Sequence, residues 1–192
     1  MGIELPGESA GLLPDDEWKR RVMKDAWRAG DTCNVSIGQG ALLVTPLQMA
    51  VFAAALGNGG YVYRPRLVNH GIPEGDLVNR MAWSAKTMSV VRGGMLDVVQ
   101  AETGTGKRAR IEGVSIGGKT GTAQYGQGKK HAWMIAFAPF DAPRYAIAMV
   151  LEDSVSGGIT VAPRIRHLLQ YMLIRDGTVV PQTVGPEGNV QG

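Results

Sequence analysis

The 192-residue sequence has a single cysteine, three histidines and no long apolar run. One cysteine, Cys33, excludes a disulfide within the chain, and dispersed histidines exclude a Cys/His zinc pattern, so we expect no metal and no cofactor. We expect Cys33 to be a small buried residue. No segment approaches the roughly 20 apolar residues of a membrane span, and the first residues lack a signal-peptide pattern.

The sequence also lacks a strong excess of charge of either sign. It has 20 basic and 17 acidic residues. The basic residues form separate short groups at 107–110, 129–130 and 164–166 without interleaved aromatic side chains, which argues against a nucleic-acid partner. A content of 44% hydrophobic and 19% charged residues is typical of a folded globular chain, and the length fits about one domain.

Two capping signals and one amphipathic pattern predict three helices. Thr45 and Pro46 precede the apolar run 47–56, and a helix that is apolar on every face is expected to be buried. Ser84 predicts the start of a second helix that runs to about Ala101. Residues 162–175 form a third, amphipathic helix. Residues 1–40 are expected to be mainly packed loop, with one short helix within 15–28.

Between the second and third helices, the hydrophobic pattern takes the period of strands. Runs at 114–124, 131–139 and 144–152 predict an antiparallel meander, against which the third helix should pack. Residues 61–68 are expected to be extended, with Pro65 favouring an edge or irregular strand. The predicted fold class is therefore α/β in the α+β sense, an antiparallel sheet packed by helices. We expect one domain over residues 1–176 and a disordered tail over 177–192.

Residues 113–120 match the phosphate-loop pattern G-x-x-x-x-G-K-[ST], and the apolar run 146–151 ends in Glu152 and Asp153, as a magnesium-binding strand would. A phosphate loop requires a buried strand before the first glycine and a helix that begins at the lysine. Residues 108–112 make a poor core strand, and the glycines that follow Lys119 disfavour a helix. The phosphate loop is therefore the less favoured interpretation.

The same residues fit the Lys-Thr-Gly strand of penicillin-recognising serine enzymes. Glycines at 117, 118 and 121 leave room for an extended peptide along the strand edge. Lys119 supplies a cation, Thr120 and Thr122 supply hydroxyls for a terminal carboxylate, and the backbone N–H of residue 122 can point at a developing oxyanion. The predicted substrate-binding and oxyanion residues are Lys119, Thr120, Gly121 and Thr122. Taken alone, this hexapeptide would be more simply a glycine-rich turn with a solvated lysine.

Further blocks accompany this strand in a fixed order. They are GIELPGE at residues 2–8 with GLLP at 11–14 and Trp18, GDT at 30–32 with NVSIGQG at 34–40, VTPLQMA at 44–50, GKTGTAQ at 118–124, and HAW at 131–133 with FAP at 137–139. With them the chain resembles, over nearly all of residues 2–174, the transpeptidase domain of class B penicillin-binding proteins of the elongation type. The resemblance implies the penicillin-binding transpeptidase and serine β-lactamase-like fold.

The same resemblance implies a D,D-transpeptidase that cross-links peptidoglycan stem peptides and is acylated by β-lactams. It implies a location at the periplasmic face of the bacterial inner membrane and a SEDS-type glycosyltransferase as partner. In this family a serine attacks the carbonyl between two D-alanines, and a nearby lysine activates the serine.

The sequence departs from the family in lacking both Ser-x-x-Lys and Ser-x-Asn. Ser115 has the wrong spacing from Lys119 and is not assigned as a nucleophile. Because both motifs normally precede the point where this chain begins, we expect it to be the C-terminal half of a transpeptidase domain. We therefore expect no catalytic residue in this chain, no membrane anchor and no activity on its own.

Two other interpretations remain. The chain could be a non-catalytic, self-associating module, because half a domain exposes the apolar surface that the other half would cover. It could also be a serine β-lactamase-type hydrolase, which the VTPLQ block disfavours. His131 is more simply structural than catalytic, since no acid is paired with it in the sequence. Only the resemblance suggests that Gln39 supports the site from behind.

Overall fold

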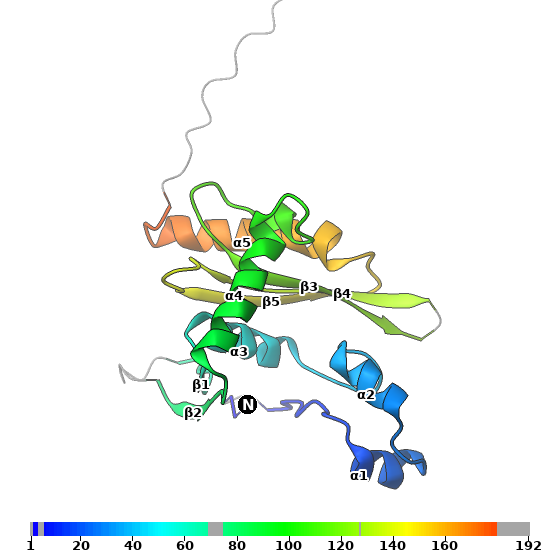
Figure 1. Ribbon diagram of the computed structural model, residues 1–192. Coiled ribbons are helices and arrows are strands. Elements are labelled where there is room, and N and C mark those ends of the chain that lie inside the picture. Colours follow the sequence, from blue (N-terminus) through cyan, green and yellow to red (C-terminus); the bar gives the residue numbers. More distant parts are fainter. Residues whose placement is uncertain (1, 4–5, 69–74, 127, 180–192) are drawn as a thin grey trace, which may run out of the picture.

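The computed structural model describes residues 2–3, 6–68, 75–126 and 128–179. Its centre is an antiparallel sheet of β3 (Gly117–Tyr125), β4 (Lys129–Ala138) and β5 (Tyr145–Leu151), in the order β3-β4-β5. Figure 1 shows α5 (Ala162–Arg175) over one face of the sheet and α3 (Pro46–Gly57) over the other. The predicted meander and its helical layers are confirmed.

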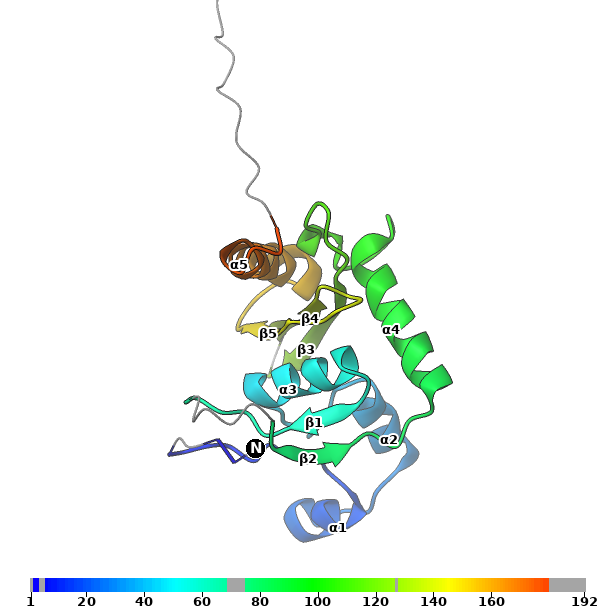
Figure 2. The same cartoon turned by 90° about the vertical axis from the view of Figure 1, so that its left-hand side faces the viewer.

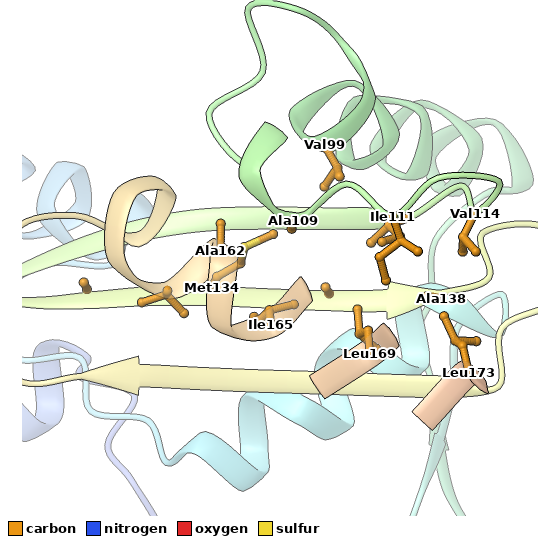
Figure 3. Packing of buried hydrophobic residues seen from close by; sticks show 14 residues of the cluster. Val99, Ala109, Ile111, Val114, Met134, Ala138, Ala162, Ile165, Leu169 and Leu173 are labelled. Atoms are coloured by element: carbon orange, nitrogen blue, oxygen red, sulfur yellow. The ribbon is translucent and has the colours of Figure 1, made fainter. Parts of the chain in front are cut away.

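The C-terminal half of the central strand β4 is buried on both faces. Strand alternation directs Met134 and Ala138 toward α5, where they join Ile165, Leu169 and Leu173 in one core (Figure 3). The alternate residues of β4 face a second core, formed with α3 and α4 (Ala85–Gln100) and containing Ala53, Leu56, Met88, Met95, Ile135 and Phe137. Full burial of each large side chain contributes about 1.5–3 kcal/mol, so the two cores hold the sheet between its helices.

The helix boundaries follow local capping chemistry. The Thr45 hydroxyl accepts a hydrogen bond from the N–H of Gln48 at 3.1 Å, and the Gln48 side chain accepts one from the N–H of Thr45 at 2.8 Å. Ser84 caps α4 by accepting from the N–H of Thr87 at 3.0 Å. These two predicted helix starts are confirmed, as is the predicted extent of α5.

One side chain, Arg92, ties α4 to the end of α3 and to the turn after β4. Its guanidinium donates to the carbonyl of Leu56 at 2.9 Å, to that of Gly57, and to that of Phe140 at 2.7 Å. The guanidinium also lies over the rings of Phe137 and Phe140. Arg92 therefore satisfies carbonyls that the last turn of α3 leaves without intrahelical partners.

Two burial predictions are wrong. Cys33 is exposed. In α3, residues such as Ala53 and Leu56 are buried, but Phe52 is 38% exposed. The reason is that the sheet covers only one side of α3, so part of this helix is exposed although its sequence is apolar on every face.

The N-terminal region holds more helix than predicted. A short helix, α1 (Asp16–Trp18), continues into the π-helical turn η1 (Lys19–Met23), and a further helix, α2 (Ala29–Ser36), follows. Every residue of α2 is at least partly exposed, so it has no apolar stripe that a sequence pattern could reveal. It is held instead by the buried Lys19, whose Nζ lies 2.7 Å from Asp31 and 3.3 Å from Asp25. The hydrogen bond with Asp31 raises the pKa of Lys19, and in turn Lys19 lowers the pKa of Asp31.

A small ribbon of β1 (Tyr61–Tyr63) and β2 (Leu77–Arg80) lies beside α3 (Figure 2). Only the first three residues of the expected extended segment 61–68 pair as a strand. Of the predicted tail 177–192, residues 180–192 lie outside the described residues. Within the described ranges, no helix combines the length and apolar character that crossing a bilayer requires.

Candidate functional site

The predicted site residues Lys119, Thr120, Gly121 and Thr122 lie in the middle of β3, an edge strand. Among the described residues, β3 pairs with β4 alone. Backbone groups of successive residues point alternately toward the neighbouring strand and away from it. The side chain of Gln39 binds the carbonyl of Thr122 from the free side. The N–H and C=O groups of Thr122, and by the same period those of Thr120, therefore face the free edge.

Lys119 reaches this edge with its ammonium group. Its side chain is exposed, on the face of the sheet that also carries Ile135, and Nζ donates a hydrogen bond to the carbonyl of Thr120 at 2.6 Å. The outward carbonyls of Thr120 and Thr122 thus each accept from a side chain. Between them lies the outward N–H of Thr122, next to the positive charge of Lys119. A hydrogen-bond donor beside a positive charge is the arrangement that stabilises an oxyanion.

A surface cavity of about 400 Å³ adjoins the opposite face of the same strand segment. Its lining residues come from three segments and are Gly104, Thr105, Lys107, Arg108, Thr120, Gly121, Thr122, Ser156, Gly157, Gly158 and Ile159. The hydroxyls of Thr105 and Thr120 lie 2.7 Å apart. With several hydroxyls and two cationic side chains, the cavity suits an acidic ligand. Sequence analysis missed the lining segments 104–108 and 156–159, which no motif marks.

The structure brings Thr120, Gly121 and Thr122 together at the cavity, whereas Lys119 does not line it. The structure also gives a different reason why positions 117 and 118 are glycine. A Cβ at Gly117 would lie 2.5 Å from the ring of Phe137, and one at Gly118 would lie 2.9 Å from the methyl group of Met134. Glycine at 117 and 118 is therefore required for packing of β3 against the core rather than for access of a peptide. At Gly121 a Cβ would make only an ordinary contact, 3.5 Å from Trp133.

Gln39 contacts the site strand directly. Its Nε2 donates to the carbonyl of Thr122 at 3.1 Å, and its Oε1 accepts from the N–H of Gln124 at 3.2 Å. The flanking Gly38 and Gly40 have φ values of 74° and 76°, a conformation that favours glycine. Gln39 therefore contacts the site strand, but at its free edge rather than from behind as expected.

His131 lies in a packed cluster at the tip of the β3–β4 hairpin. Its ring stacks on that of Tyr125, with centroids 3.9 Å apart. The hydroxyl of Tyr125 donates to Asp153 at 2.6 Å, and this bond raises the pKa of Tyr125 to about 12 and lowers that of Asp153. His131 does not line the cavity, which agrees with the structural interpretation.

The phosphate-loop interpretation is wrong. Lys119 lies within a strand, where a phosphate loop would require the first turn of a helix. The carboxylate of Asp153, the candidate magnesium ligand, accepts a hydrogen bond from the hydroxyl of Tyr125, and its Oδ2 lies 3.7 Å from Nζ of Lys129. Within the part of the chain that the structure describes, no group of three or more His, Cys, Asp or Glu side chains could hold a metal ion.

Comparison with known proteins identifies the family of the chain. The family model of the penicillin binding protein transpeptidase domain matches residues 1–170. The chain belongs to this family. It is 36% identical to the peptidoglycan D,D-transpeptidase MrdA of Acinetobacter baumannii, over 90% of the chain and 29% of that protein. It is 31% identical to MrdA of Escherichia coli K12, over 91% of the chain and 31% of that protein. The chain thus spans about a third of the length of these curated relatives.

Solved structures of the transpeptidase family show the same fold. The chain matches PBP2 of Pseudomonas aeruginosa in complex with WCK 5153 at a TM-score of 0.77 and 31% identity, over 88% of the chain and 40% of that structure. It matches the complex of PBP2 and MreC from Helicobacter pylori at a TM-score of 0.78 and 31% identity, over 93% of the chain and 33% of that structure.

Proposed function

We propose that this chain provides the substrate-binding strand of a peptidoglycan D,D-transpeptidase. The observation that carries the proposal is the position of Lys119–Thr122 in an edge strand, with the N–H of Thr122 facing the open side. An extended peptide can add to such an edge through backbone hydrogen bonds. The family membership of the chain supports the same conclusion.

Each site residue has a distinct role in this proposal. The N–H of Thr122 donates to the oxyanion that develops when the peptide carbonyl is attacked, and removal of one such donor typically costs about 2.7–4 kcal/mol of transition-state stabilisation. The ammonium of Lys119 adds positive charge at the same edge. The hydroxyls of Thr120 and Thr122 donate to the terminal carboxylate of the peptide. Since the 192 residues contain no Ser-x-x-Lys, none of them is assigned as nucleophile or general base.

The proposal extends to the setting of the enzyme. It places the enzyme at the periplasmic face of the inner membrane, in cell-wall synthesis that maintains cell shape, with a SEDS-type glycosyltransferase as partner and β-lactams as acylating inhibitors. Support comes from the family and from its MrdA and PBP2 members. Self-association of the isolated chain is also proposed, because large apolar side chains such as Val155 and Ile159 are exposed. Sedimentation that shows only monomer at roughly tens of micromolar would contradict this part.

The strand assignment is tested with a short peptide that ends in D-alanyl-D-alanine. Nuclear magnetic resonance of the ¹⁵N-labelled chain should show shifts of the β3 amides, strongest at Thr120–Thr122. The same peptide with a C-terminal amide, and the variant Thr122→Val, should both bind more weakly, because each removes one side of the carboxylate–hydroxyl contact. Shifts confined to residues outside both β3 and the lining of the adjoining cavity, or equal binding of acid and amide, would contradict the proposal.

Fluorescent penicillin tests the assignment of no nucleophile to this chain. Incubation should give no covalent band. A stoichiometric adduct would show that a serine of this chain reacts, and peptide mapping would identify it.

A further inference from the structure

The side-chain amide of Gln39 takes the place of a neighbouring strand at one end of the β3 edge. It donates to Thr122 O and accepts from Gln124 N–H, so it makes both kinds of hydrogen bond that an added strand would make there. An N–H has one hydrogen to donate, so the outward N–H of Gln124 is already committed. The outward N–H of Thr122 has no such partner in the described part of the chain.

Gln39 is placed by backbone contacts of its own. Its N–H donates to the carbonyl of Asn34 at 2.9 Å, at the end of α2. The other end of α2 is held by the ion pair between Lys19 and Asp31. No residue of α2 is buried, so this helix has no apolar face that packs on the sheet. Gln39, which follows α2, connects it to the sheet through its side-chain amide. Figure 1 shows α2 below the end of the sheet at which β3 and β4 are joined.

We propose that Gln39 is a positioning residue that ends the peptide-accepting edge of β3 at Thr122. The inference rests on the proposed function, because it concerns how far a bound peptide extends along that strand. A peptide added to the edge pairs with groups up to Thr122 and does not reach Gln124. By holding the backbone on the C-terminal side of Thr122, Gln39 also fixes the direction in which the N–H of Thr122 points.

The first test measures amide hydrogen exchange in the 192-residue chain without peptide. In Gln39→Ala the amide of Gln124 should exchange at least about tenfold faster than in the wild type, since it loses its hydrogen-bond acceptor. Gln39→Leu keeps the size of the side chain and gives the same test if the alanine variant does not fold. Gln100→Ala is the matched control, because Gln100 also donates its amide to a backbone carbonyl, that of Val114 at 3.0 Å, but away from this edge.

The second test maps the bound D-alanyl-D-alanine peptide by amide shifts. In the wild type and in Gln100→Ala the affected stretch of β3 should end at Thr122, and in the Gln39 variants it should extend to Gln124. An identical stretch in all variants would overturn the inference and leave the proposed function standing. Absence of peptide binding in every variant would contradict the proposed function itself. Unchanged exchange of Gln124 in the Gln39 variants would overturn the inference whether or not the peptide binds.

Discussion

Gly157, in the turn η3 (Gly157–Val161), lies where this turn meets the sheet, and its replacement by alanine should be strongly destabilising. A Cβ at this buried position would overlap the carbonyl oxygen of Trp133 and lie 3.0 Å from that of Gly121. Overpacking of a close-packed site costs about 1–3 kcal/mol. Both obstructing atoms belong to strand backbone and cannot rotate away, so we expect Gly157→Ala to lower the free energy of unfolding by about 3 kcal/mol, the upper end of this range.

Urea unfolding, followed by circular dichroism, measures this loss. With a slope of about 2 kcal/mol per molar urea, the midpoint should fall by about 1.5 M. Gly94→Ala is the matched control: Gly94 is exposed within α4, and a Cβ there has no other atom within 4 Å. Alanine at this position should stabilise the protein by about 0.5–1 kcal/mol. Equal midpoints for Gly157→Ala and the wild type would refute the packing argument.

Three further predictions concern polar contacts. Arg92→Met should lower the free energy of unfolding by about 2–4 kcal/mol, because it leaves three carbonyl oxygens without their donor, and an unchanged urea midpoint would contradict this. In an ultraviolet titration, the step lost on Tyr125→Phe should lie near pH 12 and should move lower in Asp153→Asn. Since the folded-state pKa of Tyr125 is raised above its ordinary 10.0, its stabilising contribution is complete below pH 10 and is lost as the pH rises toward 12. The lowered pKa of Asp31 gives a contribution to stability that is present above pH 3.8 and lost as the pH falls further, so Asp31→Asn should remove the acid-induced loss of exchange protection in α2, measured relative to the intrinsic exchange rate at each pH. Because the pKa of Lys19 is raised, its contribution to stability is lost only as the pH rises above 10.5.

Much of the fold could be predicted from sequence because its determinants are local. Thr45 and Ser84 cap helices through residues three positions further along the chain. The apolar runs of β4 and β5 follow one another with a short turn, so their antiparallel pairing requires no distant information. The strand identity of Lys119 followed from the glycines after it, which cannot sustain the helix of a phosphate loop.

The rest of the site depends on contacts that join distant parts of the chain. Gln39 reaches a strand more than 80 residues away, and sequence pattern alone gave no reason for that contact beyond the resemblance. The cavity beside Thr120 is completed by Thr105 and by the turn at Gly157, which no periodicity connects. The helix α2 was missed because it is stabilised by an ion pair and by polar contacts rather than by an apolar face.

The order β3-β4-β5 gives the sheet two outer edges of different character. Strands are spaced about 4.8 Å apart, so the outer edge of β5 lies roughly 10 Å from β3, with β4 between them. The sequence of β5, YAIAMVL, has neither charge nor proline, the features with which proteins usually block recruitment of another strand. Any polypeptide that enlarges this sheet can therefore join along Tyr145–Leu151 and leave the threonine-bearing margin unobstructed.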